Sequence, residues 1–204
     1  VATGEPERQV AIASRAHLPC SVSAAIAEVG CAEACLVLLE NKDAETVPFS
    51  LDRIVDRFGH LAAIRDVLLA RGDLSVPTRQ ALVVKLSQSL AEFVTACDWL
   101  AADRARRITR EACEKATIAL AAESPEGEVR PLVRHLRESG QLTAGLILRS
   151  LLSGNVGLFE EALAELADVP LARAAGIVHD AQKKRRGGPL GQEDAAFAGE
   201  RQHR

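Results

Sequence analysis

Apolar residues in the first half of the chain recur at the three- and four-residue intervals of an α-helix. One predicted helix begins at Pro48 and carries four of them on a single face: Leu51, Ile54, Val55 and Phe58. Gly59 follows and predicts the end of this helix, because glycine adopts the left-handed conformation that closes many helices. A second, shorter helix is predicted over residues 61–71. The pattern therefore indicates two helices joined by a tight turn.

The same pattern returns at a fixed interval. Pro19, Pro48 and Pro77 are each 29 positions apart, and proline is well tolerated in the first turn of a helix, where its missing N–H would have no partner. Other matched positions keep this step: Gly30 and Gly59; Ile26, Val55 and Val84; Leu39 and Leu68. A fixed period of this size is typical of stacked helical repeats. The three prolines therefore predict three helix starts.

The repeat segment, residues 1–90, is expected to begin partway through a unit. Residues 9–15 match the second helix of a unit whose first helix is missing. A repeat of this kind cannot bury its apolar face without neighbours. We therefore expect the natural protein to carry further repeats upstream of Val1.

Beyond Leu90 the 29-residue register is lost and other helices are predicted. They cover residues 102–122, 126–139 and 144–153, then one that follows Asn155 and one from Pro170 to Asp180. The segment 144–153 is apolar nearly all round, which predicts a central position, with Thr143 as its cap. The helix after Asn155 has a predicted buried face: Phe159, Ala162, Leu163 and Leu166.

No segment alternates apolar and polar residues for long, so we predict no sheet. The expected fold class is all-α: a right-handed α-solenoid of HEAT-like helical pairs with a C-terminal helical bundle over residues 91–181. Residues 182–204 carry the basic run Lys183–Arg186 and few apolar side chains, and we expect a disordered tail there.

Composition supports this class and limits the function. Aromatic residues make up only 3% of the chain, with no Tyr and one Trp, so the core must be aliphatic. The formal net charge is −3, so the chain as a whole is not a basic nucleic-acid binder. Five cysteines at irregular spacing are typical of reduced thiols in a cytoplasmic protein. The apolar runs are too short to cross a bilayer.

A resemblance to a known family follows from particular stretches of sequence. The run SGQLTAGLILRSLLSGNVGLFEEALAELADVPLARA, together with LPCSVSAAIAEVG and VLLARGDLSVP, resembles an uncharacterised family found mainly in alphaproteobacteria. That family is catalogued only as a domain of unknown function with HEAT-like helical repeats. The resemblance covers roughly residues 9–181 and implies an all-α solenoid. It implies no activity, cofactor or catalytic residue.

Arginines gather on two of the predicted helices. Arg106 belongs to the cluster on 102–122, and the candidate interaction surface consists of six others: Arg104, Arg107, Arg110, Arg130, Arg134 and Arg137. If the two helices pack antiparallel, both sets line one groove, and guanidinium groups suit carboxylate or phosphate partners. The alternative is a solvated helix face, because acidic residues are interspersed with the arginines.

Other candidate sites are weaker. Four potential zinc ligands lie close in sequence, His17, Cys20, Cys31 and Cys35, but their spacings do not match known structural sites, so we predict neither metal nor cofactor. HEAT-like DNA glycosylases use Trp and Asp in a concave groove, but Asp98-Trp99 lies at a predicted helix end and the chain has a single Trp, so we do not predict this activity. Arg149 lies in the middle of an apolar helix and requires a partner, for which Glu160, Glu161 and Glu165 are the candidates.

These features predict a non-enzymatic protein-binding scaffold in the bacterial cytoplasm. No phosphate-binding loop and no hydrolase or metalloprotease motif occurs, so we predict no catalytic residue. The expected partner is an unidentified protein, acidic where it meets the arginines. The alternative is a nucleic-acid-binding HEAT-like repeat protein that uses the arginine-rich helices over residues 102–139.

Overall fold

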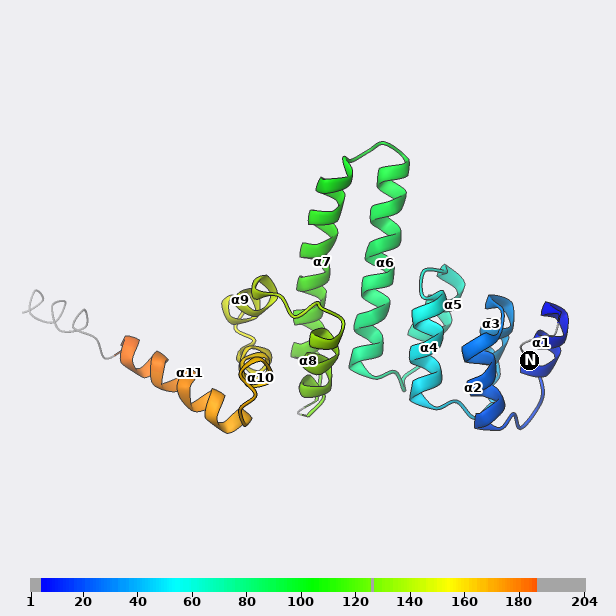
Figure 1. Ribbon diagram of the computed structural model, residues 1–204, viewed down its shortest axis with the longest axis horizontal. Coiled ribbons are helices and arrows are strands. Elements are labelled where there is room, and N and C mark those ends of the chain that lie inside the picture. The colour runs from blue at the N-terminus through cyan, green and yellow to red at the C-terminus, as the bar shows by residue number, and fades with distance from the viewer. Residues whose placement is uncertain (1–4, 126, 187–204) are drawn as a thin grey trace, which may run out of the picture.

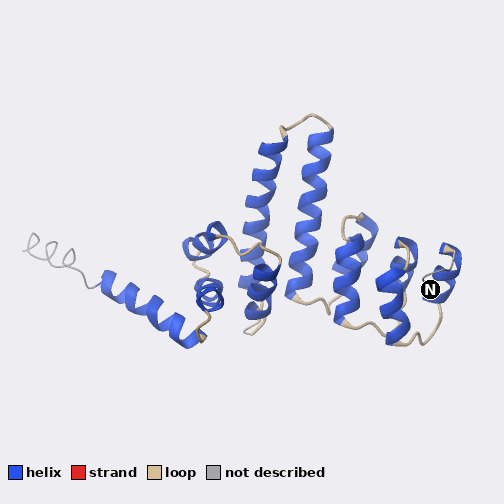
Figure 2. Cartoon of the chain, viewed as in Figure 1, coloured by secondary structure: helices blue, strands red, loops and turns tan. Residues whose placement is uncertain are grey.

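The computed structural model describes residues 5–125 and 127–186, in which every regular element is an α-helix (Figure 2). This part of the chain contains no strand, which confirms the all-α prediction. The helices are α1 (Pro6–Ala13), α2 (Cys20–Val29), α3 (Ala32–Glu40), α4 (Pro48–Phe58), α5 (Ala62–Leu69), α6 (Val76–Ala96), α7 (Ala102–Glu123), α8 (Val129–Glu138), α9 (Ala144–Leu152), α10 (Val156–Ala167) and α11 (Leu171–Arg186).

The three evenly spaced prolines do mark helix starts. Pro19 is the N-cap residue of α2, and Pro48 and Pro77 lie in the first turns of α4 and α6. At these positions the fixed φ of proline suits the helix, and its missing N–H costs no intrahelical hydrogen bond. The prediction from the 29-residue spacing is therefore confirmed for all three helices.

The helices pack in two rows. In one row α1 packs on α3 and α3 on α5; in the other α2 packs on α4 and α4 on α6. Figure 1 shows these helices side by side from the N-terminus towards the centre of the molecule. The second row continues from α6 through α8 to α10, and α9 packs on α7 and α10. Each helix thus contacts mainly its neighbours in the chain and the helices two positions away.

Two aliphatic cores hold these rows together. The first extends from Ala13 to Leu82, and the second from Val76 to Ala162. Helix α6 supplies a residue to each of them, Leu82 to the first and Val76 to the second. The expected domain boundary at residue 90 therefore falls inside a continuous helix that joins the two cores.

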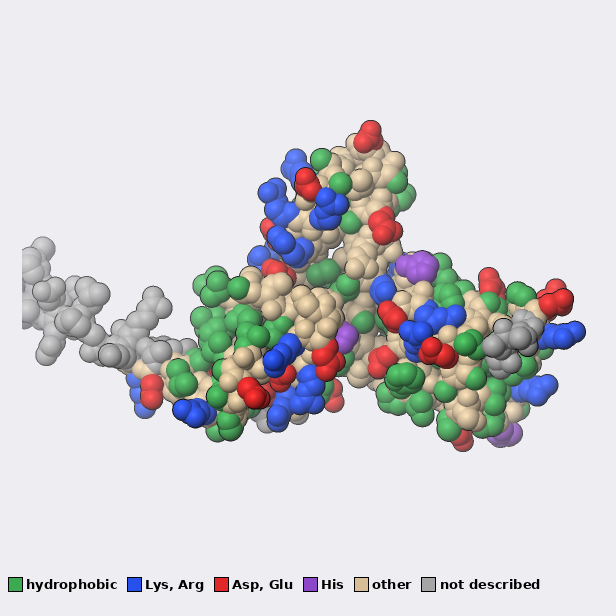
Figure 3. Space-filling view, in the orientation of Figure 1, with side chains coloured by type: hydrophobic (Ala, Val, Ile, Leu, Met, Phe, Trp, Pro, Cys, Tyr) green, Lys and Arg blue, Asp and Glu red, His purple; other side chains and the backbone are tan. Residues whose placement is uncertain are grey.

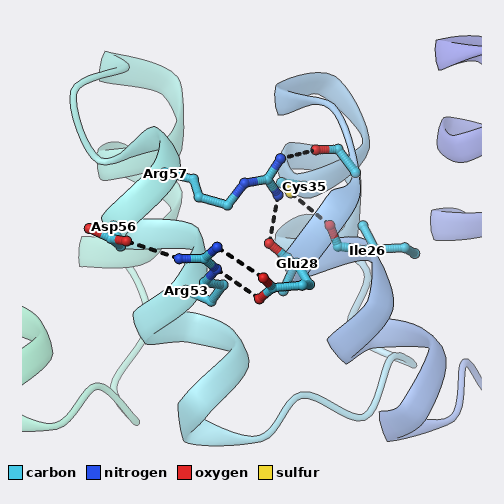
Figure 4. Close-up of polar contacts among 8 residues, drawn as sticks. Ile26, Glu28, Cys35, Arg53, Asp56 and Arg57 are labelled. Carbon is cyan, nitrogen blue, oxygen red and sulfur yellow. Dashed lines mark hydrogen bonds and ion pairs between the residues drawn. The ribbon is translucent and has the colours of Figure 1, made fainter. Parts of the chain in front are cut away.

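Two arginines of α4 make polar contacts with the C-terminal end of α2 (Figure 4). Arg57 donates from Nη1 to the carbonyl oxygen of Ala27 at 2.6 Å and from Nη2 to that of Gly30 at 2.7 Å. Arg53 pairs with both carboxylate oxygens of Glu28, at 2.7 and 2.9 Å. The last carbonyls of a helix have no partner within the helix, so Arg57 satisfies two acceptors that α2 leaves open.

A second polar link joins α7 to α9. Glu114 accepts a hydrogen bond from Thr143 Oγ1 at 3.2 Å and pairs with Arg149 Nε at 3.1 Å. Thr143 also caps α9, as predicted, by accepting from the backbone N–H of Leu146. Arg149 does have an acidic partner, but the three candidates on α10 are wrong. The partner lies on α7 because α9 packs on α7 as well as on α10.

Two further predictions, about helices α9 and α10, are wrong. Helix α9 is not central: Leu148 and Leu152 are 58% and 87% exposed, because only one side of α9 meets α7 and α10. Leu166, assigned to the buried face of α10, is half exposed, while Leu158 and Ala164 are buried with Ala162.

Helix α11 continues to Arg186, so the basic run Lys183–Arg186 belongs to a helix. The rest of the expected tail, residues 187–204, lies outside the described residues.

The Arg57 contacts predict a measurable loss of stability. Arg57→Met removes two hydrogen bonds from a charged donor to the end of α2, and we expect it to lower the free energy of unfolding by about 2 kcal/mol. The measurement is the urea midpoint followed by circular dichroism. Arg53→Met is the matched control, because its ion pair with Glu28 is more exposed to solvent and contributes less. An equal loss in both variants would contradict the assignment.

Burial of Cys35 predicts selective thiol labelling. Burial raises the pKa of the Cys35 thiol to about 11, so in the folded protein it stays protonated between pH 8 and 10 and out of reach of reagents. The exposed thiols Cys20 and Cys97 should react rapidly with a maleimide, and Cys35 only after unfolding. Mass spectrometry of the labelled peptides identifies the sites. Rapid labelling of Cys35 in the native protein at pH 8 would contradict its buried position.

Candidate functional site

Helices α6 and α7 form a hairpin that projects beyond the stack (Figure 1). They have 21 and 22 residues, whereas α4 and α5 have 11 and 8. At 1.5 Å per residue α6 is about 30 Å long, roughly twice the length of α4. No Gly or Pro occurs from Thr78 to Ser124, so nothing in the sequence ends either helix before the turn at 97–101. The outer half of the hairpin is therefore supported mainly by α6 and α7 themselves.

The turn at the tip is closed by a residue in the left-handed conformation. Asp98 has a φ of 60°, and Trp99 donates its backbone N–H to the carbonyl oxygen of Val94 at 3.0 Å. The Trp99 ring meets Phe93 edge-on, with centroids 5.6 Å apart. The Asp98-Trp99 pair thus lies at the end of α6, as expected, where Trp99 is largely exposed.

A groove of about 1320 Å³ runs along one side of the hairpin. Helix α6 lines it with Val84, Ser87, Gln88, Ala91, Glu92, Thr95 and Ala96, and α7 with Ala102, Asp103, Arg106, Arg107, Thr109, Arg110 and Cys113. Ser139 and Gln141, which follow α8, close its lower end. Most of these side chains are small or carry hydroxyl groups. The stretch of α6 from Val84 to Ala96 makes the groove about 18 Å long.

The charged groups of the groove lie mostly on the α7 wall. Arg106 pairs with Asp103 at 2.6 Å, which leaves Arg107 and Arg110 without an ion pair among the residues that the structure describes. Glu92 is the acidic residue of the α6 wall. Two guanidinium groups one helical turn apart thus face a mostly uncharged surface, and this arrangement suits a carboxylate-bearing ligand.

The six predicted arginines do not line one groove. Arg107 and Arg110 lie in it, together with Arg106, which was left out of the predicted surface. Arg104 is an exposed residue of α7 that is not part of the groove lining. The sequence did contain a signal for Arg106, because it precedes Arg110 by four residues and so shares its helix face.

Two of the three arginines of α8, Arg130 and Arg137, lie beside α10. Arg137 donates to the carbonyl oxygen of Glu165 at 2.6 Å and pairs with its carboxylate at 3.1 Å. Burial raises the pKa of Glu161, and nearby Arg130 partly offsets this increase. Arg134 is exposed on the same helix. Because α8 packs against α6 and α10, Arg130 and Arg137 border α10, and none of the three arginines of α8 lines the groove with those of α7.

In residues 5–125 and 127–186 no three His, Cys, Asp or Glu side chains come together to hold a metal ion. Cys20 is exposed, Cys31 half-buried and Cys35 buried against the carbonyl oxygen of Ile26 at 3.5 Å. None of the helices in this part of the chain is long and apolar enough to cross a membrane.

Comparison with known proteins identifies a family. No curated protein and no solved structure matches the chain. A family model described as an uncharacterised protein conserved in bacteria, DUF2336, matches residues 1–185, which includes the whole stretch on which the resemblance was based. The chain belongs to this uncharacterised bacterial family, DUF2336.

Proposed function

We propose that this chain is a non-enzymatic protein-binding scaffold whose α6–α7 groove takes an acidic segment of a partner protein. The observation that carries the proposal is the pair Arg107 and Arg110 on one wall of a groove about 18 Å long. A groove of this length accommodates three turns of a helix or a short extended peptide. Small side chains along α6 leave room for the segment, and the two guanidinium groups supply partners for its carboxylates.

The fold we propose for this function is a HEAT-like α-solenoid followed by a C-terminal bundle. The packing of each helix on the helices two positions away and the 29-residue spacing of helix starts support it. Stacked helical pairs build extended surfaces on which partner proteins bind. The free thiols of Cys20 and Cys97, both exposed, favour a reducing compartment such as the cytoplasm.

Nucleic acid is the alternative ligand, and the composition of the groove favours protein. Binding of single strands relies on aromatic side chains on which bases stack, whereas the groove lining consists of small, hydroxyl, amide and charged residues. Glu92 and Asp103 would also lie close to the phosphates. A nucleic-acid strand carries a phosphate on every nucleotide, whereas an acidic protein segment can place one or two carboxylates against the arginines and neutral residues near Glu92 and Asp103.

The proposal predicts that charge reversal in the groove weakens the binding of an acidic peptide. We expect a fluorescent poly-glutamate peptide to bind the wild-type chain with an affinity that falls as salt is added. Arg107→Glu with Arg110→Glu should weaken it at least about tenfold, because the two lost guanidinium–carboxylate contacts together contribute about 1.4 kcal/mol or more. Fluorescence anisotropy measures both constants.

The matched control reverses two arginines outside the groove. Arg130→Glu with Arg134→Glu changes the net charge by the same amount on α8 and should leave peptide affinity nearly unchanged. Equal losses in both double variants would place binding elsewhere. Tighter binding of a single-stranded oligonucleotide than of the peptide, lost in the Arg107 and Arg110 variant, would instead favour the nucleic-acid function.

A further inference from the structure

The hairpin carries an exposed apolar stripe on the side of α6 away from the groove. Leu86, Leu90, Phe93 and Cys97 follow one another at steps of four, three and four residues, the heptad spacing of a coiled-coil seam. Five large side chains of the hairpin are well exposed, at 39%, 50%, 55%, 69% and 46%: Leu86, Leu90, Phe93, Trp99 and Ile108. None of them lines the groove.

The stripe continues the face by which α6 packs into the first core. Leu82 precedes Leu86 by one turn and is almost completely buried in that core. Helices α4 and α5 are too short to cover the next turns of α6, so the same face becomes exposed where the hairpin projects. Figure 3 shows hydrophobic side chains on the outer part of the hairpin, with arginines along its α7 side.

The turn brings two more apolar residues beside this stripe. The Trp99 ring packs on Phe93. Ile108 follows Trp99 by nine positions and Leu90 precedes it by nine, so the two residues lie level in an antiparallel hairpin. Trp99 and Ile108 are both exposed, and neither of them lines the groove. The exposed apolar surface is therefore continuous from the tip to the level of Leu86.

We propose that this face binds a second copy of the chain, so that two hairpins pack as a four-helix bundle in a symmetric homodimer. An isologous interface requires a self-complementary surface, and an apolar heptad stripe is self-complementary. Helices that meet along such a stripe pack with side chains of one helix between those of the other.

The size of the stripe matches what a stable dimer needs. With about 200 Å² for a large side chain, the five exposed fractions correspond to roughly 500 Å² of apolar surface. Homodimer interfaces are about two-thirds apolar in their buried area. The stripe with its polar rim therefore amounts to roughly 800 Å² per copy, the standard size for a specific interface.

The charges on the hairpin favour a neutral partner of this kind. Residues 86–113 contain four arginines and four acidic residues, Arg104, Arg106, Arg107 and Arg110 against Glu92, Asp98, Asp103 and Glu111. A surface of balanced charge has no net attraction to a strongly charged partner such as an anionic membrane. A second copy carries the same balance, so no net repulsion opposes its approach.

Sedimentation in reducing buffer tests the dimer directly. We expect the wild-type chain to show a concentration-dependent mass approaching twice 21.8 kDa, little affected by salt because apolar burial drives association. Leu90→Glu with Phe93→Glu should raise the dissociation constant at least about tenfold, since two central apolar side chains are replaced by charges. Circular dichroism confirms that the variant remains helical.

A control on α9 and a second variant in the hairpin test whether the loss of the dimer is specific to the apolar stripe. Leu148→Glu with Leu152→Glu alters two leucines on α9 that are more exposed than Leu90 and Phe93 and should leave the dimer intact. Ile108→Glu, on the partner helix of the hairpin, should weaken it in the same direction as the Leu90 and Phe93 variant. A wild-type chain that stays monomeric overturns the proposal, and flotation of that monomer with anionic vesicles would assign the face to a membrane. Dimers that survive both hairpin variants overturn it as well.

Discussion

The structure depends on a mismatch in helix length. A helix in a stack can bury its apolar face only as far as its neighbours extend, and α6 is about twice as long as α4. Its first turns pack into the core through Leu82. Among the described residues, its later turns pack mainly against α7. One side of the hairpin therefore holds the groove, and the other side is apolar and exposed. Both candidate surfaces are consequences of this single feature.

The polar contacts between helices explain why the stack can hold such a projection. Short helices have a high proportion of unpaired backbone groups at their ends, and here side chains from neighbouring helices satisfy several of them. Arg57 does so for α2, and Asn41 donates to the carbonyl oxygens of Ala13 and Arg15 after α1. The Glu114–Arg149 pair ties α9 to the lower half of α7. These contacts fix the base from which the hairpin extends.

Sequence periodicity predicted where the helices lie in the chain better than it predicted which helices pack against each other. Proline position and i, i+3, i+4 spacing depend on a helix alone, so α4 and the starts of α2 and α6 were predictable. Which helix lies opposite a given face depends on distant packing, and for that reason the acidic partner of Arg149 was assigned to the wrong helix. The apolar pattern of α9 predicted burial, but a helix at the margin of a stack has too few neighbours to cover it.

The candidate groove was only half predictable for a related reason. Clusters of arginine are visible in a sequence, and Arg107 and Arg110 were found in this way. The opposite wall consists of small residues such as Ser87, Ala91 and Thr95, whose spacing of four resembles any helix contact. These residues form a groove because, in residues 5–125 and 127–186, no third helix covers that side of the hairpin. Whether another helix covers the groove depends on the lengths of the other helices, so it cannot be predicted from the residues of the groove.

The two surfaces of the hairpin can operate together because they occupy opposite sides of the same two helices. A dimer formed through the apolar stripe leaves both grooves open, so each assembly presents two sites for acidic segments. Two sites held at a fixed separation bind a partner with two such segments far more tightly than one site does, because the second contact becomes intramolecular. Weak binding by Arg107 and Arg110 alone would then suffice for a scaffold, and the projection of the hairpin would serve to bring the two weak sites together.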